Sequence, residues 1–264
     1  MERIILIETS TALCSVALAE NGAVTAYRES SAPKAHASLT AVFVQEVLEE
    51  RGVKLEDCDA VCVSKGPGSY TGLRVGVSTA KGLCFGSGKP LLAVGTLDTL
   101  VAQSYSPAEA AALGYNPLRG STFASASTGE YDSYKYIIPM IDARRMEVYT
   151  AVFSPVISSE DEGRVEKSLP YTQITETAPA IIDENSFAEY LELGPCLFIG
   201  DGAGKCADVI RHPNARFCQC HPKASSMLQP ALQAYKEKRF EDVAYFEPFY
   251  LKEFVATVSK KKLF

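Results

Sequence analysis

The stretch SKGPGSYTGLRVGVSTAKGL, Ser64 to Leu83, decides the fold. It follows the apolar run 60–64 and reads as a glycine-rich turn that opens a helix ending near Phe85. Glycines in such a turn let backbone N–H groups approach an anion without a Cβ in the way. The stretch contains no carboxylate, cysteine or histidine. It therefore predicts a phosphate-type loop without reactive groups of its own.

The first half of the chain alternates between strand and helix patterns. Three strand-like runs, RIILIET, CSVALAE and AVTAYRE, are separated by STAL and NG, which are typical of hairpin turns. A helix is predicted over 37–51 with Gly52 as its stop, and another over 97–105 after the strand PLLAVGT. A strand meander followed by alternating helices and strands indicates an α/β layered domain.

The second half repeats the scheme of the first. LIETSTALCSVALA (6–19) and MIDARRMEVYTAVF (140–153) each contain an apolar strand, an acid, a polar turn and a returning strand. The same offset of 134 residues places Gly66 against Gly200, each after an apolar run. Two anchors at one offset predict an internal duplication. The arrangement resembles the actin-like ATPase superfamily, so we expect a duplicated, ribonuclease H-like α/β fold whose two lobes each have a mixed sheet flanked by helices.

The expected domain division follows from the duplication. An N-terminal lobe spans 1–103 and is completed by a helix over about 225–240 that crosses back to it. The second lobe spans 104–224 and includes a Ser- and Tyr-rich insertion over 114–136. Residues 241–264 form a C-terminal tail with a run of three lysines near its end.

The composition is that of an ordinary globular protein, with 47% hydrophobic and 22% charged residues. No apolar run approaches roughly 18 residues, and the N-terminus enters a strand pattern at once, so we expect a cytoplasmic protein with no membrane partner. Eight cysteines without a secretion signal predict free thiols. The formal net charge of −6 argues against a broad electrostatic surface for nucleic acid.

Four segments carry a resemblance to a known family. ETSTALCSVAL, SKGPGSYTGLRVGVSTAKGL, PMIDARRMEVYTAVF and IGDGA, in this order and at these spacings, look like the TsaB (YeaZ) family of bacterial tRNA threonylcarbamoyladenosine biosynthesis proteins. The match covers most of 3–100, then 137–153 and the region of Gly200. The GPGSYTGLR and AKGL block is highly specific, whereas the other segments are weak alone. The insertion and the tail beyond Pro248 extend past the compact family pattern.

The resemblance implies a function carried out through a partner. The family is similar to TsaD, the catalytic paralogue that transfers a threonylcarbamoyl group to N6 of adenosine 37 in tRNA and holds a metal through two histidines four residues apart. This chain has only His36, His212 and His221, and no such pair. We therefore expect a non-catalytic scaffold without a metal that binds and stabilises TsaD. The ATPase TsaE is a further expected partner, tRNA is reached through the complex, and a homodimer of the isolated chain stays open.

Two helices are the predicted partner interface. The helix over 37–51 is apolar almost all round, so a sheet can cover one side and a partner would cover the other. Along the next helix, small residues recur every four positions and predict a flat stripe for a partner helix. In the family these helices pack against the equivalent pair of TsaD, or of a second TsaB. The predicted interface residues are Leu39, Val42, Phe43, Glu46, Val47, Gly72, Arg74, Gly76, Val77, Ala80 and Lys81.

Candidate contacts to a nucleotide or another anion lie in three turns. They are Glu8, Thr9, Ser10, Gly66, Gly68, Ser69, Thr71, Gly200, Asp201 and Gly202. For the glycine loop, the alternatives are a strand-to-helix turn with Ser69 or Thr71 as N-cap and a shared subunit boundary. Glu8 stands where nucleotide-binding relatives have Asp, and Asp201 also fits a plain turn residue. We expect no tightly bound cofactor in the chain alone, with ATP or ADP as the candidate ligand at the complex interface.

Other residues leave alternatives open. Asp142, Arg144 and Arg145 of the DARR turn fit surface ion pairs or a contact with a phosphate backbone. His36 fits a structural role or the positioning of a partner helix. The Cys-x-Cys-His run 218–221 fits no common zinc finger. Two other functions stay open: a nucleotide-dependent kinase-like enzyme, which needs ATP affinity and a catalytic Asp, and a glycoprotease homologue of the same superfamily, which needs metal ligands.

Overall fold

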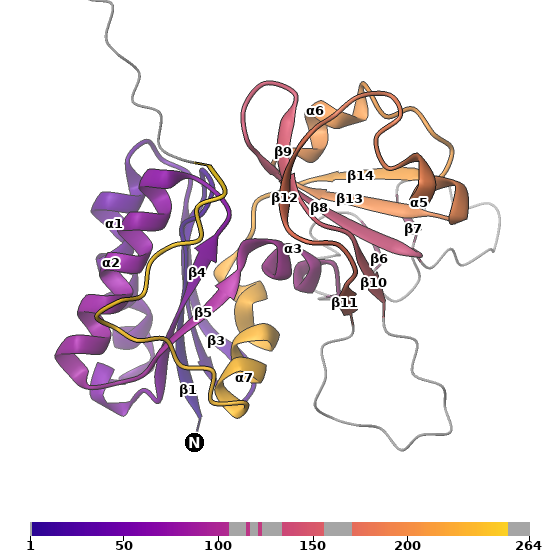
Figure 1. Cartoon of the computed structure of the whole chain (residues 1–264). Helices are drawn as coiled ribbons and strands as arrows, with labels where there is room; N and C mark the ends of the chain where they lie inside the picture. The colour runs from indigo at the N-terminus through magenta and orange to yellow at the C-terminus, as the bar shows by residue number, and fades with distance from the viewer. Residues whose placement is uncertain (1, 106–114, 117–120, 123–133, 156–170, 253–264) are drawn as a thin grey trace, which may run out of the picture.

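The computed structural model describes residues 2–105, 115–116, 121–122, 134–155 and 171–252. Two sheets stand side by side, with helices on their faces and the helix α3 (Thr96–Tyr105) between them (Figure 1). No helix in these ranges is long and apolar enough to cross a bilayer. Most of the insertion 114–136 and all of the lysine run 260–262 lie outside the described residues.

The first lobe is built on a five-stranded sheet in the order β3-β2-β1-β4-β5. Its strands are β1 (Arg3–Glu8), β2 (Cys14–Glu20), β3 (Ala23–Ser30), β4 (Ala60–Gly66) and β5 (Leu91–Gly95). The first three form an antiparallel meander, and the turn between β2 and β3 has positive φ at both Asn21 and Gly22, as a tight hairpin requires. β4 is parallel to β1, and β5 is parallel to β4.

The helices α1 (Ala35–Arg51) and α2 (Tyr70–Ser87) cover one face of this sheet. They pack on Ile5 and Ile7 of β1, which are fully buried. Burying one such side chain stabilises the fold by about 1.5–3 kcal/mol. α1 ends at Gly52, whose φ of 61° is the left-handed conformation that suits glycine. The predicted bounds of both helices are confirmed to within two residues at their ends.

The opposite face of the first sheet is covered by a segment from near the end of the chain. The 3₁₀ turn η2 (Ala224–Met227) and the helix α7 (Leu228–Lys236) pack on Ile4 and Leu6, which alternate with the residues facing α1 and α2. The predicted helix over 225–240 is therefore shorter and begins as a 3₁₀ turn. A second 3₁₀ turn, η1 (Leu55–Asp57), precedes β4.

The second lobe repeats the topology of the first. β8 pairs antiparallel with β9 and β10 and parallel with β13, which pairs parallel with β14. In the meander after β8, each of the two further strands is divided into two short strands, β9 and β10 in one and β11 and β12 in the other. β9 pairs with β12, and β10 pairs with β11. This repetition confirms the predicted duplication. The strands are β8 (Tyr136–Asp142), β9 (Glu147–Thr150), β10 (Phe153–Pro155), β11 (Tyr171–Gln173), β12 (Ala178–Ile181), β13 (Cys196–Gly200) and β14 (Ala215–Gln219).

The duplication is not a constant shift of 134 residues. Ile4 of β1 lies opposite Ala60 of β4. Ile138, which is 134 positions after Ile4, lies opposite Phe198 of β13 and not opposite residue 194. The two copies have therefore drifted in strand register, although their strand order is the same.

The helices of the second lobe are short, apart from α3. α3 carries Leu97 and Leu100 into the core of the second sheet, so a helix that we expected at the end of the first lobe packs with the second. The other face of this sheet is covered by α5 (Ala188–Leu193) and α6 (Ala203–Ala207). Within the insertion, the two-residue strands β6 and β7 (115–116 and 121–122) pair with each other.

Candidate functional site

The loop between β4 and α2 packs against the turn between β1 and β2. The Ser69 N–H donates to the Ser10 carbonyl at 2.6 Å. A Cβ on Gly68 would lie 2.3 Å from the same oxygen, so glycine is required for this close approach. The Ser69 hydroxyl accepts from the Gly72 N–H at 3.3 Å and caps α2. Ser69 is thus the N-cap, whereas Thr71 is exposed in the first turn of the helix.

Glu8 and Thr9 point into the first lobe and are fully buried. The Glu8 carboxylate accepts from the Ser10 N–H at 2.7 Å, and burial raises the pKa of this carboxyl above its ordinary value. The Thr9 hydroxyl donates to the Gly72 carbonyl at 2.9 Å. Both side chains therefore serve the contact between the turn and the loop.

The second glycine turn follows β13 and is held by β8. Gly200 has a φ of 135°, and a Cβ there would meet the Met140 carbonyl oxygen at 2.2 Å. The Gly202 N–H donates to that carbonyl at 3.0 Å. The Asp201 carboxylate accepts from the Asp142 N–H at 2.9 Å, and burial raises the pKa of Asp201. Asp201 is thus bonded as a turn residue.

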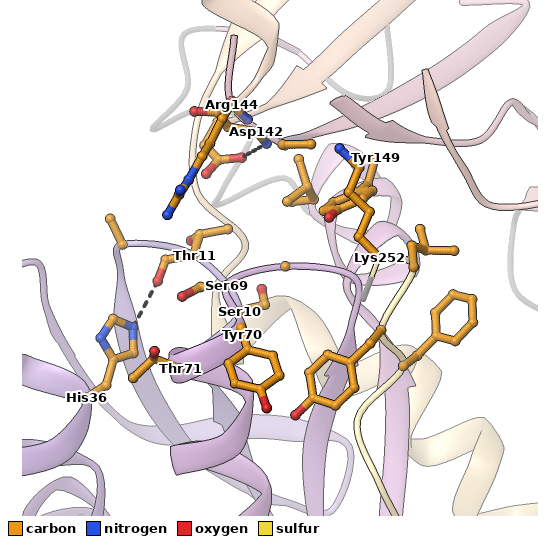
Figure 2. Close-up of a pocket in the computed structure, with 18 residues that line it drawn as sticks. Ser10, Thr11, His36, Ser69, Tyr70, Thr71, Asp142, Arg144, Tyr149 and Lys252 are labelled. Carbon is orange, nitrogen blue, oxygen red and sulfur yellow. Dashed lines mark hydrogen bonds between the residues drawn. The ribbon is translucent and has the colours of Figure 1, made fainter. Parts of the chain in front are cut away.

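A cleft of about 660 Å³ lies between the two lobes (Figure 2). The candidate contacts that line it are Ser10, Gly68, Ser69, Thr71 and Asp201. The candidates that do not line it are Glu8, Thr9, Gly66, Gly200 and Gly202. Half of the predicted set is therefore brought together, and the other half supports the backbone behind it.

Several residues that line the cleft were not among the candidate nucleotide contacts, although Arg144 was considered as a contact to a phosphate backbone. Arg144 reaches it from the β8–β9 hairpin, Tyr149 from β9 and Thr11 from the first lobe, and residues 249–252 form one wall. The cleft thus combines hydroxyl groups and the Arg144 guanidinium, which can bind an anion, with the carboxylates of Asp142 and Asp201. The DARR turn was the sequence signal for this part of the cleft. Nothing in the sequence indicated that the tail returns here.

The β8–β9 hairpin is fastened by Lys205 of α6. The Lys205 ammonium pairs with Asp142 and donates to the carbonyls of Arg145 at 2.8 Å and Glu147 at 2.7 Å. Arg144 and Arg145 have φ values of 72° and 49°, a conformation that costs free energy for residues other than glycine. Asp142 is ion-paired as expected, but with Lys205, which we did not predict, and not with an arginine of its own turn.

Thr11, in the turn between β1 and β2, lies between two histidines. His36 Nε2 is 2.8 Å from the Thr11 carbonyl oxygen, and His221 Nδ1 is 3.2 Å from its hydroxyl. His36 therefore has a structural partner within the chain. Cys218 and Cys220 are buried, and the part of the chain that the structure describes holds no group of three His, Cys, Asp or Glu residues that could bind a metal ion.

The row of small residues on α2, one of the two predicted interface helices, faces the turn between β1 and β2. A Cβ on Gly76 would lie 2.2 Å from the Thr9 hydroxyl oxygen, so the stripe allows close packing on this chain's own turn. The prediction that it receives a partner helix is wrong, because small residues permit any close neighbour. Six of the predicted interface residues are buried within the chain. They are Phe43 and Val47 of α1, and Gly72, Gly76, Val77 and Ala80 of α2.

The polar residues predicted at the interface have partners within the chain. Glu46 of α1 pairs with Arg28 at 2.9 Å. Arg74 of α2 donates to the Tyr70 hydroxyl at 2.9 Å, and Lys81 donates to two backbone carbonyls of the C-terminal segment. Glu46 and Lys81 therefore tie the helical layer to β3 and to the C-terminal segment, whereas Arg74 bonds within α2.

Apolar side chains on the outer surface of this layer remain in water. Val42 of α1 is 42% exposed, and Leu39 is partly exposed. Phe85 of α2, which we did not predict, is 87% exposed. Phe85 and Val42 thus leave apolar area on α1 and α2 that a partner could cover.

A short part of the chain is similar to a family of transferases. The family model described as TsaD: tRNA N6-adenosine threonylcarbamoyltransferase matches residues 29–118, which include α1 and α2. The tRNA N6-adenosine threonylcarbamoyltransferase of Agrobacterium fabrum is 42% identical over 67 residues, which are 25% of this chain and 18% of that protein. The likeness to the transferase is therefore local.

Proteins named tRNA threonylcarbamoyladenosine biosynthesis protein TsaB are similar over nearly the whole chain. The Escherichia coli protein is 29% identical over 259 residues, covering 96% of each chain. The Bacillus subtilis protein is 27% identical over 257 residues, covering 94% of this chain and 93% of that one. The solved structure of YeaZ from Pseudomonas aeruginosa has the same fold, with a TM-score of 0.72, 23% identity and coverage of 95% and 100%. The chain is therefore similar over nearly its whole length to the TsaB (YeaZ) family of tRNA threonylcarbamoyladenosine biosynthesis proteins.

Proposed function

We propose that the chain is a non-catalytic subunit in the synthesis of N6-threonylcarbamoyladenosine at position 37 of tRNA, and that it binds and stabilises the transferase TsaD. The observation that carries the proposal is the position of the transferase-like segment. Residues 29–118, which match the TsaD model, contain both α1 and α2. Two paralogues that present a similar face can pair about a pseudo-twofold axis, as identical subunits do about a true one.

The exposed apolar residues of this face support the same proposal. Phe85 is 87% exposed and Val42 is 42% exposed, so neither is used fully by the core. Burying such a side chain contributes about 1.5–3 kcal/mol before the costs of association. The same face would join two copies of this chain when the transferase is absent.

Glu8 and Gly66, two of the candidate nucleotide contacts, are covered by other parts of the chain, which supports the absence of transfer activity in the chain alone. Glu8 is buried and hydrogen-bonded within its own lobe, and the Phe249 carbonyl lies 2.8 Å from where a Cβ on Gly66 would be. We therefore propose that the lone chain has no transfer activity and no tightly bound cofactor. ATP or ADP would bind at the joint with TsaD, a TsaE-type ATPase would be a further partner, and tRNA would be reached through the complex.

Mixing the purified chain with the cognate TsaD tests the proposal. We expect a stable complex by size-exclusion chromatography with light scattering. With threonylcarbamoyl-AMP supplied as the donor, which would release AMP, we expect transfer to tRNA in the mixture but not with this chain alone. Phe85→Asp should weaken the complex at least about tenfold, which is about 1.4 kcal/mol. Ile181→Asp is the matched control, because Ile181 is 78% exposed on β12 of the other lobe.

The possible results have separate meanings. A wild-type chain that does not associate with TsaD would contradict the proposed function. A complex that Phe85→Asp leaves as tight as wild type would contradict the interface. Transfer of the threonylcarbamoyl group by this chain without TsaD would contradict its non-catalytic role.

A further inference from the structure

The C-terminal segment Glu241–Lys252, which we call the strap, joins parts of the molecule that are far apart in sequence. Glu241 bridges Leu91 at the edge of β5. From there the strap, drawn in yellow, crosses in front of the helical layer of the first lobe and ends beside the second lobe (Figure 1). The strap therefore lies across both lobes.

The first half of the strap is firmly part of the first lobe. Val243 and Phe246 pack against the core beneath α1 and α2. The Lys81 ammonium donates to the carbonyls of Ala244 at 3.1 Å and Phe246 at 3.0 Å, and the Phe246 N–H donates to the Asp242 carbonyl at 2.8 Å. Residues 241–246 thus combine apolar packing with hydrogen bonds.

The second half of the strap is held by fewer contacts. The Phe249 N–H donates to the Lys65 carbonyl at 2.7 Å. The Tyr250 ring lies against the Tyr70 ring, with 4.9 Å between centroids. The Phe249 and Tyr250 residues remain 44% and 37% exposed, and Pro248 has no N–H to donate. Its two aromatic residues are therefore more exposed than Val243 and Phe246, which are themselves only partly buried but pack on the core of the first lobe.

The end of the strap is attached to the opposite lobe. Lys252 pairs with Glu147 of β9, and its ammonium lies 5.7 Å from the centroid of the Tyr149 ring. Both members of this ion pair are partly exposed, at 40% and 24%, and exposed ion pairs contribute little to stability. The contact to the second lobe is therefore easily broken.

The second half of the strap covers the glycine loop and one side of the cleft. Residues 249–252 line the cleft, and Tyr250 lies beside Tyr70 at the start of α2 (Figure 2). The Phe249 carbonyl lies over Gly66, 2.8 Å from the position of an ideal Cβ. Moving this half away would uncover the loop and the helix start without disturbing the core of either lobe.

We propose that residues 247–252 are a lid of the inter-lobe cleft, which opens about Glu247 and Pro248 while residues 241–246 stay bound to the first lobe. The contrast between the two halves carries this inference. Segments with few buried apolar contacts open locally at a lower free energy than the core does. The lid would control the access of an anionic ligand to the cleft, and it does not depend on the proposed partner.

Amide hydrogen exchange of the full-length chain tests the lid. In wild type, the Phe249 amide should exchange at least about tenfold faster than the Phe246 amide. Lys252→Met and Tyr250→Ser should each accelerate exchange of the Phe249 amide by about two- to fivefold. Exchange in peptides covering 66–70 should accelerate to the same extent. Exchange in 241–246 should stay unchanged. Lys236→Met on α7, which is exposed and outside the strap, should alter none of these rates.

Two results would overturn the lid. If the amides of Phe246 and Phe249 exchange at one rate and accelerate together, the strap opens as a single unit with the first lobe. If Phe249 accelerates while residues 66–70 do not, the end of the strap frays without uncovering the loop. The thermal unfolding of each variant, expected to match wild type, shows that the changes in exchange are local.

Discussion

The Thr9 hydroxyl occupies the place that a side chain at Gly76 would need, because a Cβ on Gly76 would lie 2.2 Å from Thr9 Oγ1. This hydroxyl is buried and donates to the Gly72 carbonyl at 2.9 Å, so it loses a hydrogen bond if it moves. A Cβ on Gly72 would lie 2.1 Å from the Thr9 carbonyl oxygen. The glycines of α2 therefore set how closely this helix lies on the turn between β1 and β2.

Substituting these glycines should test this packing directly. Gly72→Ala and Gly76→Ala should each lower the free energy of unfolding by about 1–3 kcal/mol, because the added methyl group forces the helix off the turn. Gly82→Ala on the same helix is the control, since nothing lies within 4 Å of its Cβ position, and it should stabilise by up to about 1 kcal/mol. Urea denaturation measures all three. Equal effects at the three positions would show that helix propensity, and not the contact with Thr9, governs them.

Glu20 should make stability depend on acid pH. Its carboxylate accepts from Arg3 at 2.8 Å and from Arg51 at 2.9 Å, and the hydrogen bond with Arg3 is the main cause that lowers the pKa of Glu20 to about 2. Because this folded-state pKa lies below the ordinary value of 4.5, the stabilisation is present above about pH 4.5 and is lost as the pH falls towards about 2. Glu20→Gln should cost about 1–2 kcal/mol near neutral pH, since water screens part of the interaction at the half-exposed Arg51.

The measurement for Glu20 is the free energy of unfolding against pH. The curves of wild type and Glu20→Gln should converge near pH 2. Glu56→Gln, at an exposed position of η1, is the control and should follow wild type throughout. A constant difference between Glu20→Gln and wild type at every pH would mean that lost packing, and not the ion pairs, causes the destabilisation.

Glu8 should affect stability with the opposite sign. Burial raises the pKa of Glu8, so ionisation costs more in the folded chain, and wild-type stability should fall as the pH rises from the ordinary range of a glutamate through this raised pKa. Glu8→Gln removes the titrating group, so its stability relative to wild type should increase as the pH rises above the ordinary range of a glutamate. The variant should still support TsaD fully. A loss of support with an unchanged fold would give Glu8 a functional role.

Removing the Lys205 ammonium should loosen the β8–β9 hairpin. Lys205→Met leaves Asp142 without its ion-pair partner and the carbonyls of Arg145 and Glu147 without their donor. We expect a loss of about 1–3 kcal/mol in stability, because hydrogen bonds from a charged donor are stronger than neutral ones. Amide exchange over 142–147 should accelerate, while exchange in β1 stays unchanged. Unaltered exchange in the hairpin would show that its backbone is held by the strands alone.

The elements of the fold that depend on local chemistry could be predicted from the sequence. The Asn21-Gly22 hairpin and the stop of α1 at Gly52 rest on backbone conformations that these residues favour. The inward direction of the α2 stripe could not be predicted. A row of small residues permits close approach from either side, and the position of Thr9, 63 residues earlier than Gly72, decides which side is used.

The same distinction holds for the cleft. Ser69 and Asp201 sit in glycine-containing turns and Ser10 in a polar turn between two strand patterns, and the structure places all three at the cleft. The strap and Tyr149 carry no such local signal. They reach the cleft because of how the two sheets and the returning chain pack together, which spacing along the sequence does not reveal. The insertion over 114–136 lies mostly outside the described residues.

The two lobes differ most in their helices. α1 and α2 have 17 and 18 residues, whereas α5 and α6 have six and five. Among the described residues, only the first lobe thus carries a layer of two long helices. A molecule with one binding surface can bind one neighbour through it. Open-ended growth into a filament needs two different adhesive sides on every subunit. At the interface proposed above, the shortness of α5 and α6 would therefore limit assembly through the α1 and α2 layer to pairs.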